Sequence, residues 1–249
     1  MPQVKVATLN LFNRMGEWDD RFPLVIDQLE ALAPDVIGFQ EVDLGIDQGM
    51  LISREVNKRL GSQPHYRIKH AASPGQRAAV FGIGTLTRID CLEHEILDLM
   101  TFDRMSQRLV CAVDGKRFAF VNNHLHHPME AKTERLDQAE RLLAWLARFE
   151  PLPTVVLGDF NAYEGEETVA LFKSRFRSAH EAVHGREPQL TWPTPVNTWD
   201  NSPAGTLDYI YVSPEFKILD AGLAFDTPAA GNPALFPSDH LGLFATLEW

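Results

Sequence analysis

Polar side chains that could coordinate a metal ion or hold a proton follow one apolar run after another in this sequence. In VVLGDFN, residues 155–161, the apolar run leads directly into Asp159, and Asn161 follows two positions later. The same association recurs at Asn10 in ATLNL, Glu41 in VIGFQE, His124 in FAFVNNH, Asp208 in LDYIYV, and Asp239 and His240 in SDH. These residue types indicate metal binding or proton transfer near the ends of several strands.

Each of these residues, taken alone, also has a structural explanation. Asp159 could stabilise a turn, because aspartate favours such loop positions. Glu41 could end in solvent, and His124 could belong to a surface cluster with His126 and His127. It is the ordered set, and not any one member, that points to chemistry.

Short apolar and β-branched runs predict the strands that would position these residues. We expect strands at residues 4–11, 35–42, 65–71, 79–88, 91–99, 108–113, 118–123, 154–160, 207–213, 216–222 and 241–249. Apolar residues at helical spacing predict helices over about 22–32, 49–60, 136–149 and 165–174. Pro34 should stop the first helix, Gly61 should close the second, and Pro151 follows the third.

Two stretches have a character of their own. Residues 65–123 predict a sheet built largely from sequence neighbours, with a hairpin turn at Asp114 and Gly115. Residues 180–206, with Trp192 and Trp199 among prolines, predict a long loop with little regular structure. Its tryptophans could face a substrate or plug the core. The carboxylates of Glu164, Glu166 and Glu167 are expected in the first turn of the helix over about 165–174.

The sum of these elements favours an α/β fold, a four-layer α-β-β-α sandwich of two stacked mixed sheets flanked by helices. No composition shift suggests a linker, so residues 1–249 are expected to form a single domain. Only Cys91 and Cys111 are present, which excludes a disulfide scaffold and favours two buried free thiols.

The charge balance bears on possible partners. The chain has 23 Lys and Arg against 34 Asp and Glu, a formal charge of −11, which should repel a polyanion at long range. The N-terminus does not resemble a signal peptide, and no apolar run approaches the roughly 20 residues that cross a bilayer. A soluble, cytoplasmic protein without a transmembrane segment is therefore expected.

The series TLNL, FQEV, NNHL, GDFN, TLDYIYV and SDH resembles the endonuclease/exonuclease/phosphatase superfamily of metal-dependent phosphohydrolases. The resemblance spans Asn10 to His240, nearly the whole chain. GDFN and SDH in this order, with a strand carrying LDYI between them, are specific together and weak apart. The resemblance implies an α-β-β-α sandwich, which agrees with the architecture expected from the elements.

The resemblance also implies roles for the matching residues. Glu41 would be the principal ligand of Mg²⁺, with Asn10 and Asp239 nearby, and Mn²⁺ could substitute. Asp159 and Asn161 would hold the attacking water, with Asp159 as the base; if the segment is extended, one intervening residue places both side chains on one side.

Two histidines complete the implied site. His240, paired with Asp208, and His124 would donate to the phosphoryl oxygens as negative charge grows on them. One departure matters: pancreatic-type deoxyribonucleases place an acidic partner of a catalytic histidine on the strand corresponding to 79–88, and residues 78–88 contain no Asp or Glu. This weakens a deoxyribonuclease interpretation and leaves His124 without a predicted partner.

Three hypotheses follow. The first is a Mg²⁺-dependent phosphodiesterase or phosphatase that acts on a small phosphorylated compound or a phospholipid headgroup. The second is an endonuclease or exonuclease on DNA or RNA, which needs a basic or aromatic path, with candidates Arg77, Arg88, Arg104, Arg108, Trp192 and Trp199. The third is a non-catalytic binding module, although no residue of the set is missing here.

Overall fold

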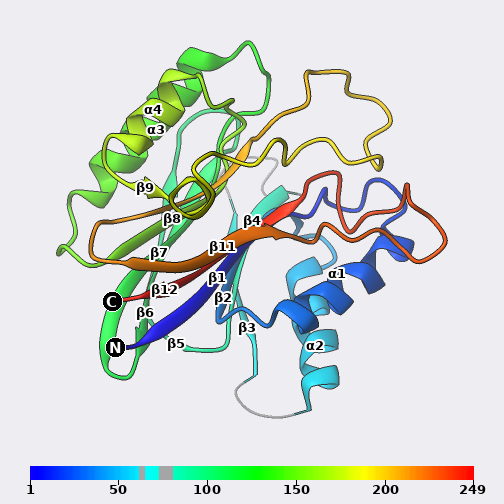
Figure 1. Cartoon of the computed structure of the whole chain (residues 1–249), viewed down its shortest axis with the longest axis horizontal. Helices are drawn as coiled ribbons and strands as arrows, with labels where there is room; N and C mark the ends of the chain where they lie inside the picture. Colours follow the sequence, from blue (N-terminus) through cyan, green and yellow to red (C-terminus); the bar gives the residue numbers. More distant parts are fainter. Residues whose placement is uncertain (62–64, 73–80) are drawn as a thin grey trace.

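Two stacked six-stranded sheets, covered by helices on their outer faces, make up the protein (Figure 1). The structure is a computed structural model that describes residues 1–61, 65–72 and 81–249. Helices α1 and α2 lie on one side of the sheets, and α3 and α4 lie on the other (Figure 1). The expected four-layer α-β-β-α sandwich is confirmed.

The first sheet has the strand order β11-β12-β1-β2-β4-β3. Its strands are β1 (Gln3–Asn10), β2 (Val36–Asp43), β3 (Arg67–Ala72), β4 (Phe81–Thr87), β11 (Lys217–Ala224) and β12 (Gly242–Glu248). Strands β1 and β2 are parallel, and the other neighbours are antiparallel.

The second sheet has the order β5-β6-β7-β8-β10-β9. Its strands are β5 (Asp90–Asp98), β6 (Met105–Val113), β7 (Lys116–His124), β8 (Thr154–Asp159), β9 (Arg177–Ser178) and β10 (Asp208–Val212). Strands β7 and β8 are parallel, and the other neighbours are antiparallel.

The two parallel pairs decide where the polar strand ends meet. Asn10 at the end of β1 is in register with Gln40 on β2, and His124 at the end of β7 is in register with Asp159 on β8. Strand β10 runs antiparallel to β8, so Asp208 at its start is also paired with Asp159. The carboxyl ends of parallel strands lie at one edge of a sheet, so these residues gather at one end of the sandwich.

Three apolar layers hold the sandwich together. The layer between the sheets contains Val6, Leu109, Phe118 and Leu157, all fully buried. The layer beneath α1 and α2 and the layer beneath α3 and α4 fill the outer faces. Strands β1, β2, β7 and β8 are covered on both faces. Their sequences are therefore nearly continuous apolar runs.

The helices are α1 (Trp18–Leu32), α2 (Gln48–Leu60), α3 (Lys132–Leu146), α4 (Glu167–Lys173) and α5 (Ala179–His184). Helix α1 ends at Leu32, two residues before Pro34, with Ala33 as a left-handed cap, and α2 ends at Leu60 with Gly61 as its left-handed cap, φ 61°. Both expected helix ends are confirmed.

Several local expectations were wrong. Residues 65–123 do not form one sheet, because β3 and β4 join the first sheet and β5–β7 join the second. The short helix α5 occupies the start of the loop expected at 180–206. Glu166 precedes α4 as its N-cap, since the helix begins at Glu167. Both cysteines are free, but Cys91 is only half-buried.

The start of the strand expected at 79–88 and Arg77 lie outside the described residues. Within residues 1–61, 65–72 and 81–249, no helix is long and apolar enough to span a membrane.

Candidate active site

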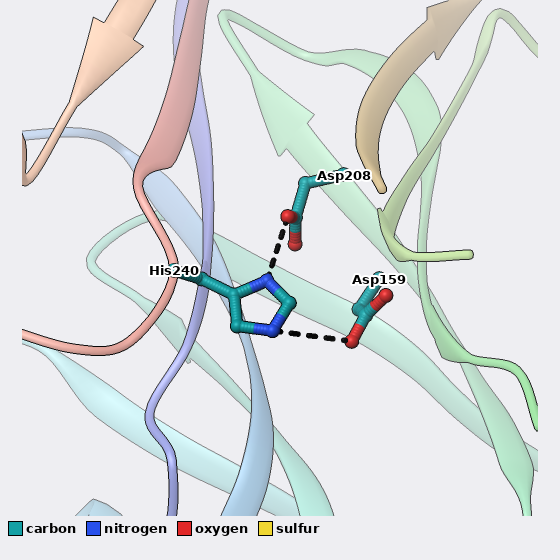
Figure 2. A group of neighbouring side chains, drawn as sticks. All are labelled: Asp159, Asp208 and His240. Atoms are coloured by element: carbon teal, nitrogen blue, oxygen red, sulfur yellow. Dashed lines mark hydrogen bonds and ion pairs between the residues drawn. The ribbon is translucent and has the colours of Figure 1, made fainter. Parts of the chain in front are cut away.

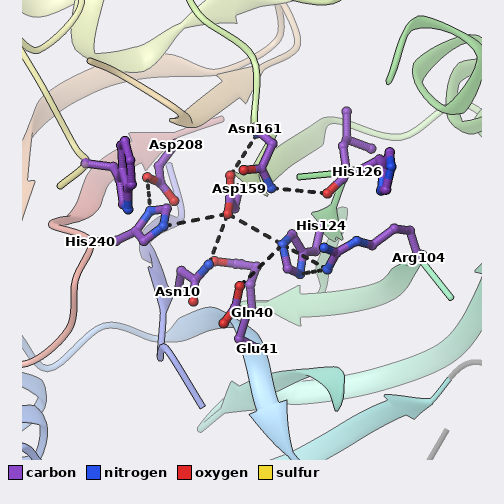
Figure 3. Close-up of polar contacts among 12 residues, drawn as sticks. Asn10, Gln40, Glu41, Arg104, His124, His126, Asp159, Asn161, Asp208 and His240 are labelled. Atoms are coloured by element: carbon purple, nitrogen blue, oxygen red, sulfur yellow. Dashed lines mark hydrogen bonds and ion pairs between the residues drawn. The ribbon is translucent and has the colours of Figure 1, made fainter. Parts of the chain in front are cut away.

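A cavity of about 320 Å³ opens at the end of the sandwich where the polar strand ends meet. Five of the predicted site residues line it: Glu41, Asp159, Asn161, Asp239 and His240. The other three, Asn10, His124 and Asp208, contact these residues from behind or beside them (Figure 3). The structure therefore brings all eight predicted residues together.

Asp159 is the centre of the polar network (Figure 3). Asn10 donates from Nδ2 to Asp159 Oδ2 at 3.0 Å, and the backbone N–H of Asn161 donates to Asp159 Oδ1 at 2.8 Å. Burial, and next the charge of Asp208, raise the pKa of Asp159 above its usual value. A buried carboxylate with a raised pKa and fixed hydrogen bonds suits a general base.

The reason we expected Asp159 and Asn161 to share one side was wrong. Strand β8 ends at Asp159, and Asn161 has a left-handed backbone with φ 49°, so the segment is a tight turn and not extended. The side chain of Asn161 donates to the backbone oxygen of Leu125 at 3.1 Å, which fixes it beside the end of β7. The turn itself aims both residues at the cavity.

Gly158 allows the end of strand β8 to place Asp159 at the cavity. It has φ 133°, and a Cβ atom there would lie 2.0 Å from the backbone oxygen of Asn123 on β7. Only glycine adopts this backbone easily and allows so close an approach of two strands. In the GDFN motif, Gly158 therefore allows the two strands to approach closely, and Asp159 presents a carboxylate to the cavity.

His240 is held between two carboxylates (Figure 2). Its Nδ1 lies 2.8 Å from Asp208 Oδ2, and its Nε2 lies 3.9 Å from Asp159 Oδ2. Burial lowers the pKa of His240, but Asp208 and then Asp239 outweigh it and hold the pKa well above the usual value. The ring is therefore a cation that carries a proton towards the cavity.

The ligand atoms of Asp159, Asp208 and His240 lie within 4.8 Å of one another, close enough to share a metal ion. The contacts argue against that use of the histidine. A ring that donates to Asp208 and carries positive charge repels a cation, because a metal ligand must be the neutral imidazole. The three residues fit a path for a proton better than a metal site.

His124 has a different environment from His240. Its Nε2 lies 3.5 Å from Asp159 and 3.9 Å from Glu41, while Nη1 of Arg104 lies 2.9 and 3.1 Å from its two ring nitrogens. Burial, and next the charge of Arg104, lower the pKa of His124 well below its usual value. Because guanidinium only donates, the ring beside it is neutral and accepts. Arg104 is thus the partner that the sequence did not supply.

Glu41 reaches the cavity through an irregularity in strand β2. The register of β2 against β4 shifts between Phe39 and Val42, and Glu41 itself has φ 49°. Such a bulge turns a side chain away from the direction that a regular strand would give it. Burial raises the free energy of the charged form of Glu41 and thereby raises its pKa.

Asp239 is the second carboxylate on this side of the cavity. Trp192 donates from Nε1 to its Oδ2 at 3.3 Å, and Ser238 donates to its Oδ1 at 3.2 Å. Burial is the largest cause that raises the pKa of Asp239 to about 6, and Glu41 adds to it. Two neighbouring carboxylates with raised pKa values form a donor set whose charge a divalent cation would compensate.

Aromatic and apolar side chains surround the mouth of the cavity. Phe102 and Trp199 are 59% and 58% exposed, and Phe81 and Met15 also line the cavity with much of their surface in solvent. Such a group of exposed apolar residues around a polar site marks a binding surface. We call Met15, Phe81, Phe102 and Trp199 the apolar rim.

The charged residues around the cavity are mainly acidic. Among the described lining residues, Arg104 is the sole arginine or lysine, against five carboxylates, Glu41, Asp103, Asp159, Asp200 and Asp239. Of the arginines considered for a nucleic-acid path that the structure describes, Arg104 lines the cavity and the other two do not. Arg88 pairs with Asp35 at 3.0 Å, and Arg108 pairs with Glu95 at 2.9 Å, both away from the cavity.

Sequence reasoning undervalued Arg104, although a signal was present. The turn at Asp114 and Gly115 pairs Ser106 with Asn123, and one step further along this register Met105 lies opposite His124, so Arg104, the residue before β6, falls next to it. Counting residue pairs outwards from the predicted turn would have placed Arg104 close to His124.

Trp192 and Trp199 both line the cavity, so the loop after α5 faces the site.

Comparison with known proteins places the sequence in a wider group. Residues 7–240 match the Endonuclease/Exonuclease/phosphatase family. Nocturnin from Mus musculus is 27% identical over 256 residues, which cover 91% of this chain and 58% of that protein. The chain therefore spans less than two thirds of the length of this curated relative.

Solved structures share the fold. TDP2 from D. rerio, complexed with a single-strand DNA product, superposes with a TM-score of 0.79 and 18% identity, with 100% of both chains covered. Mannosyl-6-phosphatase from Bacteroides thetaiotaomicron has a TM-score of 0.76 and 20% identity, covering 99% of this chain and 100% of its own. At these identities the likeness establishes the architecture.

Proposed function

Since this chain belongs to the endonuclease/exonuclease/phosphatase family, whose members hydrolyse phosphate esters, we propose that it is a Mg²⁺-dependent hydrolase of a small phosphate ester. The observation that carries the proposal is the position of Asp159. It is a buried carboxylate at the floor of the cavity, between the cationic His240 and the pair of Arg104 and His124. A base and groups that bind negative charge therefore surround one small volume.

In the proposed reaction, Asp159 accepts a proton from a water that attacks the phosphorus. Asn10 and the backbone of Asn161 keep the carboxylate aimed, and the oxygen of the Asn161 side chain helps to orient the water. His240, held as a cation by Asp208, donates from Nε2 to a phosphoryl oxygen as negative charge grows there.

Arg104 and His124 act on the opposite side of Asp159. The guanidinium of Arg104 is a fixed cation that can bind a phosphoryl oxygen, and the neutral His124 ring keeps it in place. The family resemblance implies that His124 donates to a phosphoryl oxygen, and this role stays a prediction. The contact with Arg104 argues against it, because the ring accepts a hydrogen bond there.

The residues that would hold Mg²⁺ are Glu41 and Asp239, with Asn10 beside them. The site fits a hard cation, because all donors are oxygens and both carboxylates, buried Asp239 and the partly exposed Glu41, have raised pKa values. Bound there, the ion would polarise the phosphoryl group and offset charge on the leaving oxygen. Mn²⁺, which prefers similar ligands, is the proposed substitute.

We assign the apolar rim to the part of the substrate beyond the phosphate. Phe102 and Trp199 present aromatic surface to solvent at the mouth, while Asp103 and Asp200 make the surroundings acidic. A compact ester whose remaining part is apolar and carries no negative charge fits this mouth, as does a phospholipid headgroup.

A nuclease is the second candidate, and the same rim favours it. Aromatic side chains stack on nucleic-acid bases, and TDP2 of D. rerio, which shares the fold, was solved with a single-strand DNA product. The scarcity of basic residues around the described part of the cavity argues against a long polyanion. A steep salt dependence of substrate affinity would favour the nuclease.

Phosphorus NMR with pooled substrates tests the proposal. The pool contains an oligonucleotide, sphingomyelin and glycerophospholipids in micelles, inositol phosphates and a simple monoester, each with Mg²⁺. An Asp159→Asn sample serves as the control for contaminating activity. Loss of a resonance other than the oligonucleotide's, with wild type alone, supports the proposal. Cleavage of the oligonucleotide alone makes the protein a nuclease, and no turnover at all supports a binding module.

A further inference from the structure

Arg21 lies fully buried in the first turn of helix α1, where it binds loop backbone instead of a carboxylate. Its Nη1 donates to the backbone oxygens of Leu11 at 3.0 Å and Pro237 at 2.7 Å, and its Nε donates to that of Gly16 at 2.7 Å. Its Nη2 donates to Asn13 and Met15. One guanidinium thus joins the loop after β1 to the loop before β12.

Arg135 also binds loop backbone, on the other side of the sandwich, and in addition binds a carboxylate. It is fully buried in the first turn of α3, and it donates to the backbone oxygens of His126, Pro128 and Met129. Its Nη2 also donates to Glu166 Oε2 at 2.9 Å. This guanidinium joins the loop after β7 to the loop after β8.

The two arginines occupy equivalent places in the chain. Arg21 is eleven residues after Asn10, Arg135 is eleven residues after His124, and each is the fourth residue of its helix. A cation in the first turn of a helix opposes the helix dipole. Loop oxygens at both places, and the Glu166 carboxylate beside Arg135, offset that cost and make the buried arginines favourable.

Each arginine connects loops that carry different parts of the site. Leu11 directly follows Asn10, and Pro237 lies two residues before Asp239, so Arg21 joins the two loops beside the proposed metal ligands. Arg135 joins the loop of His126 to Glu166, whose Oε1 accepts from the backbone N–H of Tyr163 two residues after Asn161.

We propose that Arg21 and Arg135 are a matched pair of positioning residues with separate tasks, an inference that rests on the proposed function. Arg21 sets the distance between Asn10 and Asp239, and so governs metal affinity. Arg135 sets the place of Asn161 and the loop 126–130 around the reacting phosphate, and so governs turnover without changing metal affinity. Displacement of a reacting group by about 1 Å can cost roughly 100-fold in rate.

The test compares Arg21→Lys and Arg135→Lys with Arg108→Lys as a matched control. Arg108 is also buried and ion-paired, but it lies on β6 away from the cavity. Hydrogen exchange of metal-free protein, calorimetry with Mg²⁺ alone, and kcat and KM are measured for each. Should a lysine variant not fold, the corresponding glutamine variant, which keeps amide donors without the charge, replaces it.

For Arg21→Lys, we expect faster exchange in residues 11–16 and 236–240 and Mg²⁺ binding weakened by about tenfold or more. For Arg135→Lys, we expect faster exchange in residues 126–131 and 162–166, unchanged Mg²⁺ affinity, and kcat lowered by roughly tenfold or more with little change in KM. Arg108→Lys should change none of these, whatever it does to thermal stability.

Two results would overturn the inference. In one, all three variants lose activity in proportion to their loss of stability. In the other, Arg21→Lys and Arg135→Lys change metal affinity equally. If wild type neither binds Mg²⁺ nor turns over any ester, the proposed function fails; the division between metal affinity and turnover then fails with it, while the exchange pattern still tests which loops each arginine holds.

Discussion

Oδ2 of Asp208 lies 2.8 Å from Nδ1 of His240, which leaves Nε2 of the same ring facing Asp159. This contact fixes the proton on the ring and the direction in which the ring presents it. The raised pKa of His240 and the raised pKa of Asp159 both depend on the charge of Asp208. One carboxylate behind the cavity therefore sets the protonation of two groups in front of it.

We predict a bell-shaped pH profile of kcat/KM that Asp208→Asn moves to lower pH. The acidic limb reports Asp159, which must be ionised, and the alkaline limb reports His240, which must be protonated. Removal of the Asp208 charge lowers both pKa values, so both limbs move in the same direction. Initial rates between pH 4 and 10 measure the shift.

Asp220→Asn, on strand β11, is the control for this experiment and should leave the profile in place. A profile of Asp208→Asn that falls in height without moving would mean that Asp208 only orients the ring.

Asp159→Asn should lower kcat by about 100- to 10,000-fold, because the base is lost while the hydrogen bond from Asn161 is retained. The melting temperature should not fall, since burial and Asp208 already disfavour the charge of Asp159. Steady-state kinetics and thermal unfolding of the same samples check both parts. Turnover within a few-fold of wild type would remove Asp159 from the reaction.

Mg²⁺ affinity should fall as the pH drops below about 6, where Asp239 takes up a proton. The sign follows from competition, because a carboxylate must lose its proton to bind a cation. Calorimetry at several pH values measures the affinity. In Asp239→Asn the affinity should be weak at every pH, with less dependence between pH 5 and 7. An unchanged dependence would place the ion elsewhere.

Trp199→Ala and Phe102→Ala should raise KM for esters with an apolar group and leave KM for a simple monoester nearly unchanged. Both side chains are largely exposed at the mouth, so their removal should cost little stability. The ratio of kcat/KM between the two substrates measures the effect. Equal losses for both substrates would show that the apolar rim shapes the site in general and does not select the substrate.

Gly158→Ala should destabilise the protein by about 3 kcal/mol or more, because the new Cβ would meet Asn123 in a backbone region that alanine avoids. Urea unfolding measures the change. Gly165→Ala is the matched control, since nothing lies within 4 Å of a Cβ there. A loss of similar size in both variants would mean that neither the close approach nor the backbone angle matters.

Local patterns were enough to find most of the fold. Periodicity of apolar residues located the strands, Pro34 and Gly61 marked two helix ends, and the order of polar residues after apolar runs named eight side chains that meet at one cavity. These features are readable from sequence because each depends on neighbours a few residues away or on burial of a strand.

The tertiary structure alone decided which side chains face one another. The bulge that aims Glu41, the contact between Asn10 and Asp159, and the bond from Arg21 to Pro237 all join segments far apart in the chain. Such contacts depend on strand register and on how the two sheets stack, and a local pattern contains neither. The sequence determined which groups are present, and the packing of the sheets decided their charges and partners, because burial and distance set both.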